Sequence, residues 1–194
     1  ERLVRLIETG GPIPVSTYMQ LALHDSAQGY YATRPGLGTD FITAPEVSQV
    51  FGELIGLWVV NEWRAMGAPD SFHLVEIGPG RGTLMADALR LAYVAGGREF
   101  ADAAKLTLVE PSPELRKVQA ERLSDYTPSF ADTLGNVPAG PMILVANEYL
   151  DCLPARQFRK ADGQWRECVV GLDADGALAF GLAADEQRAP DGTA

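Results

Sequence analysis

The chain has 194 residues, of which 46% are hydrophobic and 22% are charged, and its formal net charge is −10. This length is enough for one full domain with a sizeable core, or for one domain plus a small appendage. No run of about 18 uncharged apolar residues is present, and residues 1–5 lack the features of a secretory signal, so we expect no membrane partner. The acidic charge argues against binding to long nucleic acid and suits a basic protein or peptide partner.

Residues 1–67 are expected to form an N-terminal helical segment. A first helix is predicted over 16–26, capped by Ser16 or Thr17, and a turn-rich loop follows from Gly29. A second helix is predicted from Pro45 to Gly67. Its apolar side chains follow helical spacing and are expected to be buried: Val47, Val50, Phe51, Leu54, Ile55 and Trp58.

Residues 68–155 alternate between strand and helix patterns, which predicts an open parallel α/β sheet of the Rossmann type. Predicted strands cover 72–77, 106–109, 129–132 and 142–146, with helices over 83–95 and 112–123. The continuous apolar run from Met142 to Ala146 favours a central strand that is covered on both faces.

Residues 156–194 contain short alternating segments separated by Asp162-Gly163 and Asp175-Gly176, which predicts β-hairpins. The last ten residues are polar and are expected to be frayed. The two cysteines and two histidines have no metal-ligand spacing, so the sequence predicts no metal site.

Three predicted strand ends carry the chemistry, because ligands of open parallel sheets bind where strands end. After the first strand comes Gly78-Pro79-Gly80-Arg81-Gly82. Thr83 stands where the dinucleotide fingerprint needs a third glycine, so the turn instead fits the G-x-G-x-G pattern of S-adenosylmethionine-dependent methyltransferases. Glu76 supplies the acid expected two residues before the first glycine, and its charge suits the ammonium of a methionine moiety. The alternative is an ordinary strand-to-helix turn.

The second strand ends at Glu110, whose carboxylate could accept hydrogen bonds from the ribose hydroxyls of an adenosine. Alternatively, Glu110 interacts with the dipole of the helix that follows it. Asp132 follows the third predicted strand and could border the adenine.

The fourth predicted strand is followed by Asn147-Glu148-Tyr149-Leu150-Asp151. Amino-methyltransferases acting on bases have an Asn or Asp and an aromatic residue here, but their prolines are missing. An arginine guanidinium stays charged, so its methylation needs carboxylates that orient it. We expect Glu148 and Asp151 to do so, with Asn147 beside the path of the methyl group. Alternatively, these residues only cap the next segment.

At these motifs the chain resembles the bacterial MidA-like proteins, a family that includes a mitochondrial arginine methyltransferase serving as an assembly factor for respiratory complex I. The resemblance covers most of residues 10–158. It rests on the Gly29-Tyr30-Tyr31 turn, on 38–48 with 51–53, on 76–84 and on 147–151.

The resemblance implies a class I methyltransferase fold with S-adenosylmethionine as cofactor. It further implies that Asp40, Thr43, Pro45 and Glu46 form a lid over the cofactor, although a plain connector is the alternative. Thr39 stands where the family has a glycine. Because family members are longer, we expect the fold to be incomplete at the C-terminus of this chain.

The sequence therefore predicts a methyltransferase, with a protein arginine as the favoured substrate. Two rivals stay open: a methyltransferase acting on a nucleic acid base or small molecule, and a non-catalytic assembly factor that binds the cofactor. The expected location is the cytoplasm for a bacterial protein and the mitochondrial matrix for a eukaryotic one.

Overall fold

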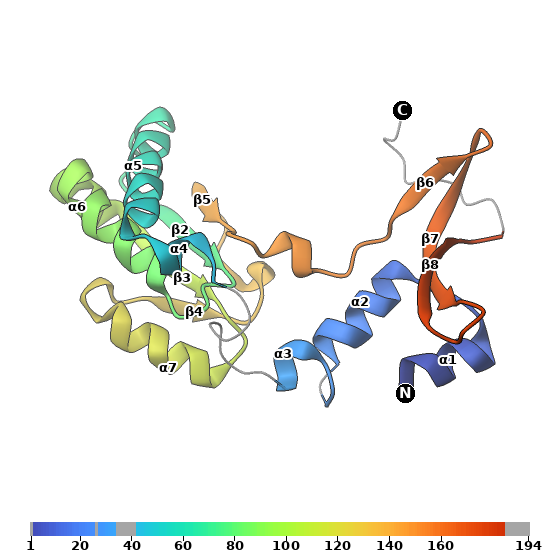
Figure 1. Cartoon of the computed structure of the whole chain (residues 1–194). Coiled ribbons are helices and arrows are strands. Elements are labelled where there is room, and N and C mark those ends of the chain that lie inside the picture. The colour runs from blue at the N-terminus through green and yellow to red at the C-terminus, as the bar shows by residue number, and fades with distance from the viewer. Residues whose placement is uncertain (1, 26, 34–41, 185–194) are drawn as a thin grey trace. The chain divides into compact units, whose positions relative to one another are not determined.

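The computed structural model describes residues 2–25, 27–33 and 42–184. The chain divides into two compact units, one made of residues 36–150 and the other of residues 1–35 and 151–194 (Figure 1). Residues 44–65, which the sequence groups with the N-terminal helices, thus belong to the first of these units, which is here called the sheet unit. The other is called the hairpin unit. Asp40 and residues 185–194 lie outside the described residues.

The sheet unit is built on four parallel strands in the order β4-β3-β2-β5. These are β2 (Phe72–Ile77), β3 (Ala104–Val109), β4 (Ser129–Ala131) and β5 (Met142–Val145). The chain moves outward from β2 through β3 to β4 and then returns to the other side of β2. The strand order therefore reverses between β2 and β5, and such switch points are where open α/β sheets bind ligands.

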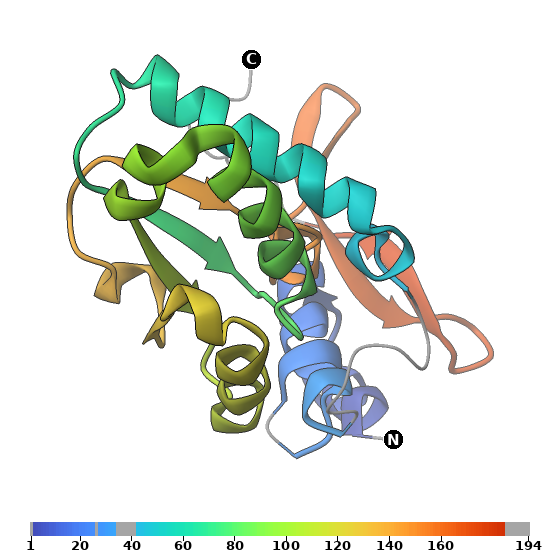
Figure 2. The same cartoon turned by 90° about the vertical axis from the view of Figure 1, so that its left-hand side faces the viewer.

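Helices α5 (Gln49–Ala65) and α6 (Thr83–Ala103) lie together on one face of this sheet (Figure 2). The core beneath them contains nearly fully buried side chains from the strands and from α6, namely Phe72, Leu74, Met85, Leu89, Phe100 and Leu108. Helix α7 (Pro113–Arg122) is capped by Ser112, whose Oγ accepts a hydrogen bond from the Leu115 N–H at 3.4 Å. The strand and helix order confirms the predicted fold class.

The predicted buried face of the second helix is wrong. The chain forms a short α4 (Ala44–Val47), breaks at Ser48 and continues as α5. Phe51 and Ile55 are partly buried, but four other members of the predicted stripe face solvent: Val47, Val50, Leu54 and Trp58. The face that contacts α6 instead carries small residues, and a Cβ at Gly56 would lie 2.1 Å from the Ala88 carbonyl oxygen. The two backbones approach too closely for larger side chains there.

The expectation of a central, doubly covered strand at 142–146 is not met within the described residues. Within residues 42–150 the structure pairs β5 with β2 alone, and Leu144 is exposed. The apolar run reads like a buried strand, but β5 lies at an edge of the described sheet.

The hairpin unit packs helices α1 (Arg2–Gly10) and α2 (Val15–His24) against an antiparallel sheet and also contains the short α3 (Tyr30–Thr33). The strands of this sheet are β1 (Ile13–Pro14), β6 (Phe158–Ala161), β7 (Gln164–Leu172) and β8 (Leu178–Leu182). Strand β7 pairs with the other three strands. Asp162 and Gly163 both have positive φ, which is the type I′ geometry that favours a two-residue hairpin turn and confirms the predicted hairpin.

The predicted cap of α2 is wrong, because the helix already begins at Val15 and has Pro14 at its N-cap position without a side-chain hydrogen bond. Ser16 and Thr17 lie inside the helix. A small core of Ile7, Ile13, Val15 and Val170 joins α1 and α2 to the strands. None of the helices in the described part of the chain is long and apolar enough to cross a membrane.

Candidate functional site

The turn after β2 is shaped by glycines in the left-handed region. Gly78, Gly80 and Gly82 have φ values of 64°, 54° and 76°. Residues with a Cβ rarely adopt this conformation, so glycine is strongly favoured along this backbone path. At Gly78 space is limiting as well, because a Cβ there would lie 2.4 Å from Tyr149 Cδ2. The turn thus leaves bare backbone at the start of α6, where free N–H groups point outward.

Glu76 is the penultimate residue of β2 and is buried, with 2% of its surface exposed. Its Oε2 atom has no hydrogen-bond partner in the structure, and burial raises the pKa of this carboxyl to about 8. An unpaired buried carboxyl is costly when ionised, so its environment favours the neutral form until a cation approaches. A ligand with an ammonium group would supply that cation.

Glu110 follows β3 and is also buried. Its Oε1 accepts a hydrogen bond from the Ser112 N–H at 2.8 Å, which agrees with the alternative reading of Glu110 as a partner of the following helix. Its Oε2 has only a long contact of 3.5 Å with Gln119 Nε2. Burial raises the pKa of the Glu110 carboxyl, while the Ser112 N–H and the Gln119 amide lower it. Oε2 is therefore still able to accept a hydrogen bond from a ligand hydroxyl.

Gln119 is a residue that the sequence reasoning missed. It lies on α7, is fully buried, and its Nε2 donates a hydrogen bond of 2.7 Å to the Gly80 carbonyl oxygen. This bond connects the glycine turn to α7 and to Glu110. The sequence carries one signal that could have identified Gln119, namely a polar residue at a helix position that faces the sheet.

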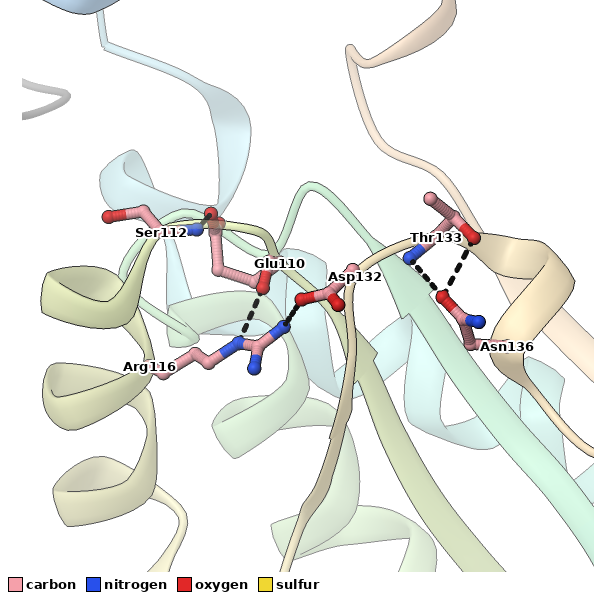
Figure 3. Close-up of polar contacts among 6 residues, drawn as sticks. All are labelled: Glu110, Ser112, Arg116, Asp132, Thr133 and Asn136. Carbon is pink, nitrogen blue, oxygen red and sulfur yellow. Dashed lines mark hydrogen bonds and ion pairs between the residues drawn. The ribbon is translucent and has the colours of Figure 1, made fainter.

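Arg116 holds the ends of β3 and β4 together (Figure 3). Its Nε donates to the Glu110 carbonyl oxygen and its Nη2 to Asp132 Oδ1, both at 2.6 Å. Asp132, which the sequence places near the adenine, is exposed and is the ion-pair partner of Arg116. Next to it, the Thr133 N–H donates to Asn136 Oδ1 at 3.2 Å, which closes the turn after β4 (Figure 3).

The segment expected to form a lid is anchored at the start of α6. Glu46 Oε1 accepts a hydrogen bond of 2.7 Å from the Thr83 hydroxyl, and Thr83 in turn accepts one from Arg122 of α7. Pro45 is buried in α4, and Thr43 is its N-cap residue without a side-chain hydrogen bond. The structure therefore brings Thr43, Pro45 and Glu46 into the unit that holds the glycine turn.

The residues after β5 divide between the two units. Asn147, Glu148 and Tyr149 belong to the sheet unit, and the Tyr149 ring packs against the cluster formed by Val75, Ile77 and Val109. Glu148 has a φ of 46°, an uncommon conformation for a residue with a Cβ. Asp151 belongs to the hairpin unit, in the short helix η3 (Leu150–Cys152). The structure therefore gathers Glu76, Glu110 and Glu148 in one body and Asp151 in another.

The sheet unit combines a parallel sheet whose strand order reverses with a glycine turn and buried acids at the carboxyl end of the strands. These features define a Rossmann-like ligand-binding domain. Residues 54–192 match the family model described as "Putative S-adenosyl-L-methionine-dependent methyltransferase". The chain belongs to this family of S-adenosylmethionine-dependent methyltransferases, which confirms the family resemblance predicted from the sequence.

Curated relatives carry more specific names. The mitochondrial protein arginine methyltransferase NDUFAF7 homolog of Drosophila melanogaster is 40% identical over 86% of this chain and 43% of its own length. The mitochondrial protein arginine methyltransferase NDUFAF7 of Homo sapiens is 38% identical over 88% of this chain and 44% of its own length. These relatives are mitochondrial by name, and neither supports the cytoplasmic location expected for a bacterial protein.

Solved structures show the same fold. A Burkholderia thailandensis protein crystallised with bound S-adenosyl-homocysteine superposes with a TM-score of 0.71 and is 29% identical, covering 95% of this chain and 49% of that protein. The chain thus spans less than half the length of the curated relatives named here and about half of this structural neighbour.

Proposed function

We propose that this protein is an enzyme that binds S-adenosylmethionine and methylates an arginine of a protein substrate. The observation that carries the proposal is the buried Glu76, with its unpartnered Oε2, directly before the left-handed turn at Gly78. When bound, the cofactor supplies a methyl group on a positively charged sulfur. The binding of S-adenosyl-homocysteine by the Burkholderia thailandensis protein and the names of the curated relatives support this reading.

The residues of the sheet unit fit such a cofactor. Glu76 would accept the ammonium of its methionine moiety, because that cation compensates an otherwise unpaired carboxylate. Glu110 would accept the ribose hydroxyls through Oε2, which has only one long protein contact. The backbone of Gly78, Pro79, Gly80 and Gly82 would line the pocket, with Asp40, Thr43, Pro45 and Glu46 forming the cover.

Glu148 of the sheet unit would bind and orient the substrate guanidinium, with Asn147 beside the transferring methyl group; for Asp151, which belongs to the hairpin unit, the same role stays a prediction from the sequence. Carboxylates suit this task because they localise the charge of a delocalised cation and align one nitrogen with the methyl donor. Positioning and electrostatic stabilisation would then supply most of the rate enhancement. A role in respiratory complex I assembly rests on the family resemblance described above.

The first test asks whether the glycine turn is the cofactor site. In Gly78→Ala the added Cβ would meet the Tyr149 ring, so we expect calorimetry to detect no binding of S-adenosyl-homocysteine. Gly67→Ala is the matched control, since Gly67 also has a positive φ but no atom within 4 Å of its Cβ position. If Gly78→Ala bound as tightly as the control, the site assignment would fail.

The second test concerns the substrate. With labelled cofactor and separated protein, RNA and metabolite fractions, we expect label on protein arginine. Glu148→Gln should keep the cofactor affinity and lower turnover by about 100-fold or more, the loss typical of a group that acts in the transition state. Label in RNA or metabolites alone would overturn the arginine assignment, and unchanged turnover would remove Glu148 from the catalytic residues.

A further inference from the structure

The Gly29-Tyr30-Tyr31 turn contributes to the family resemblance, yet the proposed cofactor site leaves it unused. It lies in the hairpin unit, between α2 and α3. A Cβ at Gly29 would lie 2.6 Å from both the backbone N and the carbonyl O of Asp25, so only glycine allows the chain to fold back this tightly. Asp25 Oδ1 accepts hydrogen bonds from the Ala27 and Gln28 N–H groups, both at 3.0 Å, and fixes the turn.

The rings of His24, Tyr30 and Tyr31 pack against one another at this turn. The His24 and Tyr31 ring centroids lie 5.4 Å apart with an interplanar angle of 31°, and Tyr30 meets Tyr31 edge to face at 5.4 Å and 89°. This arrangement fixes the orientation of Tyr31. It also leaves the residue 40% exposed, so part of its surface is open to a ligand.

The same cluster contacts η3, because His24 and Cys152, 128 positions apart in the sequence, are within hydrogen-bond distance. The His24 Nε2 atom lies 2.8 Å from the Cys152 carbonyl oxygen, a hydrogen bond when Nε2 carries the proton. Burial, together with the neighbouring Cys152 and the charge of Asp151, raises the pKa of Tyr31 to about 12. Tyr31 therefore keeps its proton at neutral pH. Asp151 directly precedes Cys152 in η3, so the contact of His24 with Cys152 and its ring contact with Tyr31 bring Asp151 to this cluster.

An exposed carboxylate beside a fixed, partly exposed aromatic pair is an arrangement that recognises a flat cation. A guanidinium can stack on the face of a tyrosine ring and donate paired hydrogen bonds to a carboxylate, whereas an ammonium offers no planar surface. The net charge of −10 further favours a cationic ligand.

We propose that Tyr30, Tyr31 and Asp151 form the subsite of the hairpin unit that binds the arginine side chain of the protein substrate. This inference rests on the proposed function and deepens it by adding two tyrosines to the substrate-binding residues. The tyrosines act by stacking and the carboxylate by hydrogen bonding, and no proton is transferred among them.

The test separates substrate affinity from cofactor affinity. In Tyr31→Ala we expect the KM for an arginine peptide to rise about 3- to 30-fold, the range for loss of a cation–π contact, while the affinity for S-adenosyl-homocysteine stays unchanged. Tyr31→Phe keeps the ring and should restore most of the lost affinity. Phe180→Ala, which removes an exposed aromatic ring of the same unit, is the control and should leave the KM unchanged.

Asp151→Asn is the second variant, and because Asp151 is exposed it should fold even if Tyr31→Ala does not. We expect it to raise the KM for the arginine peptide at least as much, and a citrulline peptide should bind weakly to every variant. An unchanged KM in both variants would overturn the inference while leaving arginine methylation intact. Weaker binding of S-adenosylmethionine but not of S-adenosyl-homocysteine would also overturn it, because the rings would then contact the sulfonium. If the unmodified protein methylated no arginine, the proposed function would fail first.

Discussion

At the scale of single residues, we predict that Glu76 determines how the candidate cofactor site responds to pH. Its pKa is raised by burial from 4.5 to about 8, so the folded protein binds this proton more tightly than the unfolded chain does. The stability that this proton contributes is fully present below pH 4.5 and is lost as the pH rises through 8. Without a ligand, the contribution of Glu76 to the free energy of unfolding therefore falls as the pH rises from 4.5 to about 8.

A bound ammonium reverses the preference of Glu76 for its neutral form, because the cation favours the ionised carboxylate. Binding then releases a proton. We predict that the affinity for S-adenosyl-homocysteine rises between pH 6 and 8, by up to about tenfold per pH unit, and levels off above the raised pKa. Titration calorimetry in buffers of different ionisation enthalpy would measure both the affinity and the proton release.

Glu76→Gln removes the titrating group but keeps nearly the same shape, so its affinity should be weak and independent of pH. Its thermal stability without ligand should also decline less than that of the unchanged protein between pH 5 and 8. Identical pH profiles for the two proteins would show that Glu76 does not contact the ammonium.

At the scale of elements, the contact between α5 and α6 determines where the glycine turn sits, since α6 starts directly after it. We predict that Gly56→Ala destabilises the protein by about 1–3 kcal/mol, the usual cost of overpacking. The added Cβ would lie 2.1 Å from the Ala88 carbonyl oxygen, and this clash outweighs the roughly 1 kcal/mol gain in helix propensity.

Denaturant unfolding of Gly56→Ala beside Asn61→Ala would measure this effect. Asn61 is exposed on the same helix, so its substitution should change the free energy of unfolding by less than about 0.5 kcal/mol. A Gly56→Ala protein as stable as the control would mean that the helices can move apart without cost.

The same helix shows where sequence reasoning reaches its limit. Strand β2 and its turn were predicted to the residue, because strand, glycines and acid are encoded within residues 72–82. The buried face of α5 was not, because the contact is made by Gly52 and Gly56 while the larger Val50 and Leu54 face solvent. Hydrophobic spacing identifies an apolar stripe, but which stripe is buried depends on the partner helix.

At the scale of the whole molecule, the candidate cofactor site is made of residues that lie far apart in the sequence. The sequence places acids at the predicted strand ends, and the strand order explains how Glu76 and Glu110 come to the same edge. It could not predict Gln119, because its bond to Gly80 joins residues 39 positions apart. Nor could it predict that Asp151 lies with Tyr31 in the hairpin unit, because that association depends on tertiary contacts between distant segments.

The most direct measurement of the central claim is a crystal structure of the protein with S-adenosyl-homocysteine. We predict the methionine ammonium within hydrogen-bond distance of Glu76 Oε2, the backbone of Gly78 and Gly80 against the ligand, and the ribose hydroxyls on Glu110. A nucleoside bound elsewhere, with Oε2 still unpartnered, would contradict the account, as would a nicotinamide cofactor in that pocket.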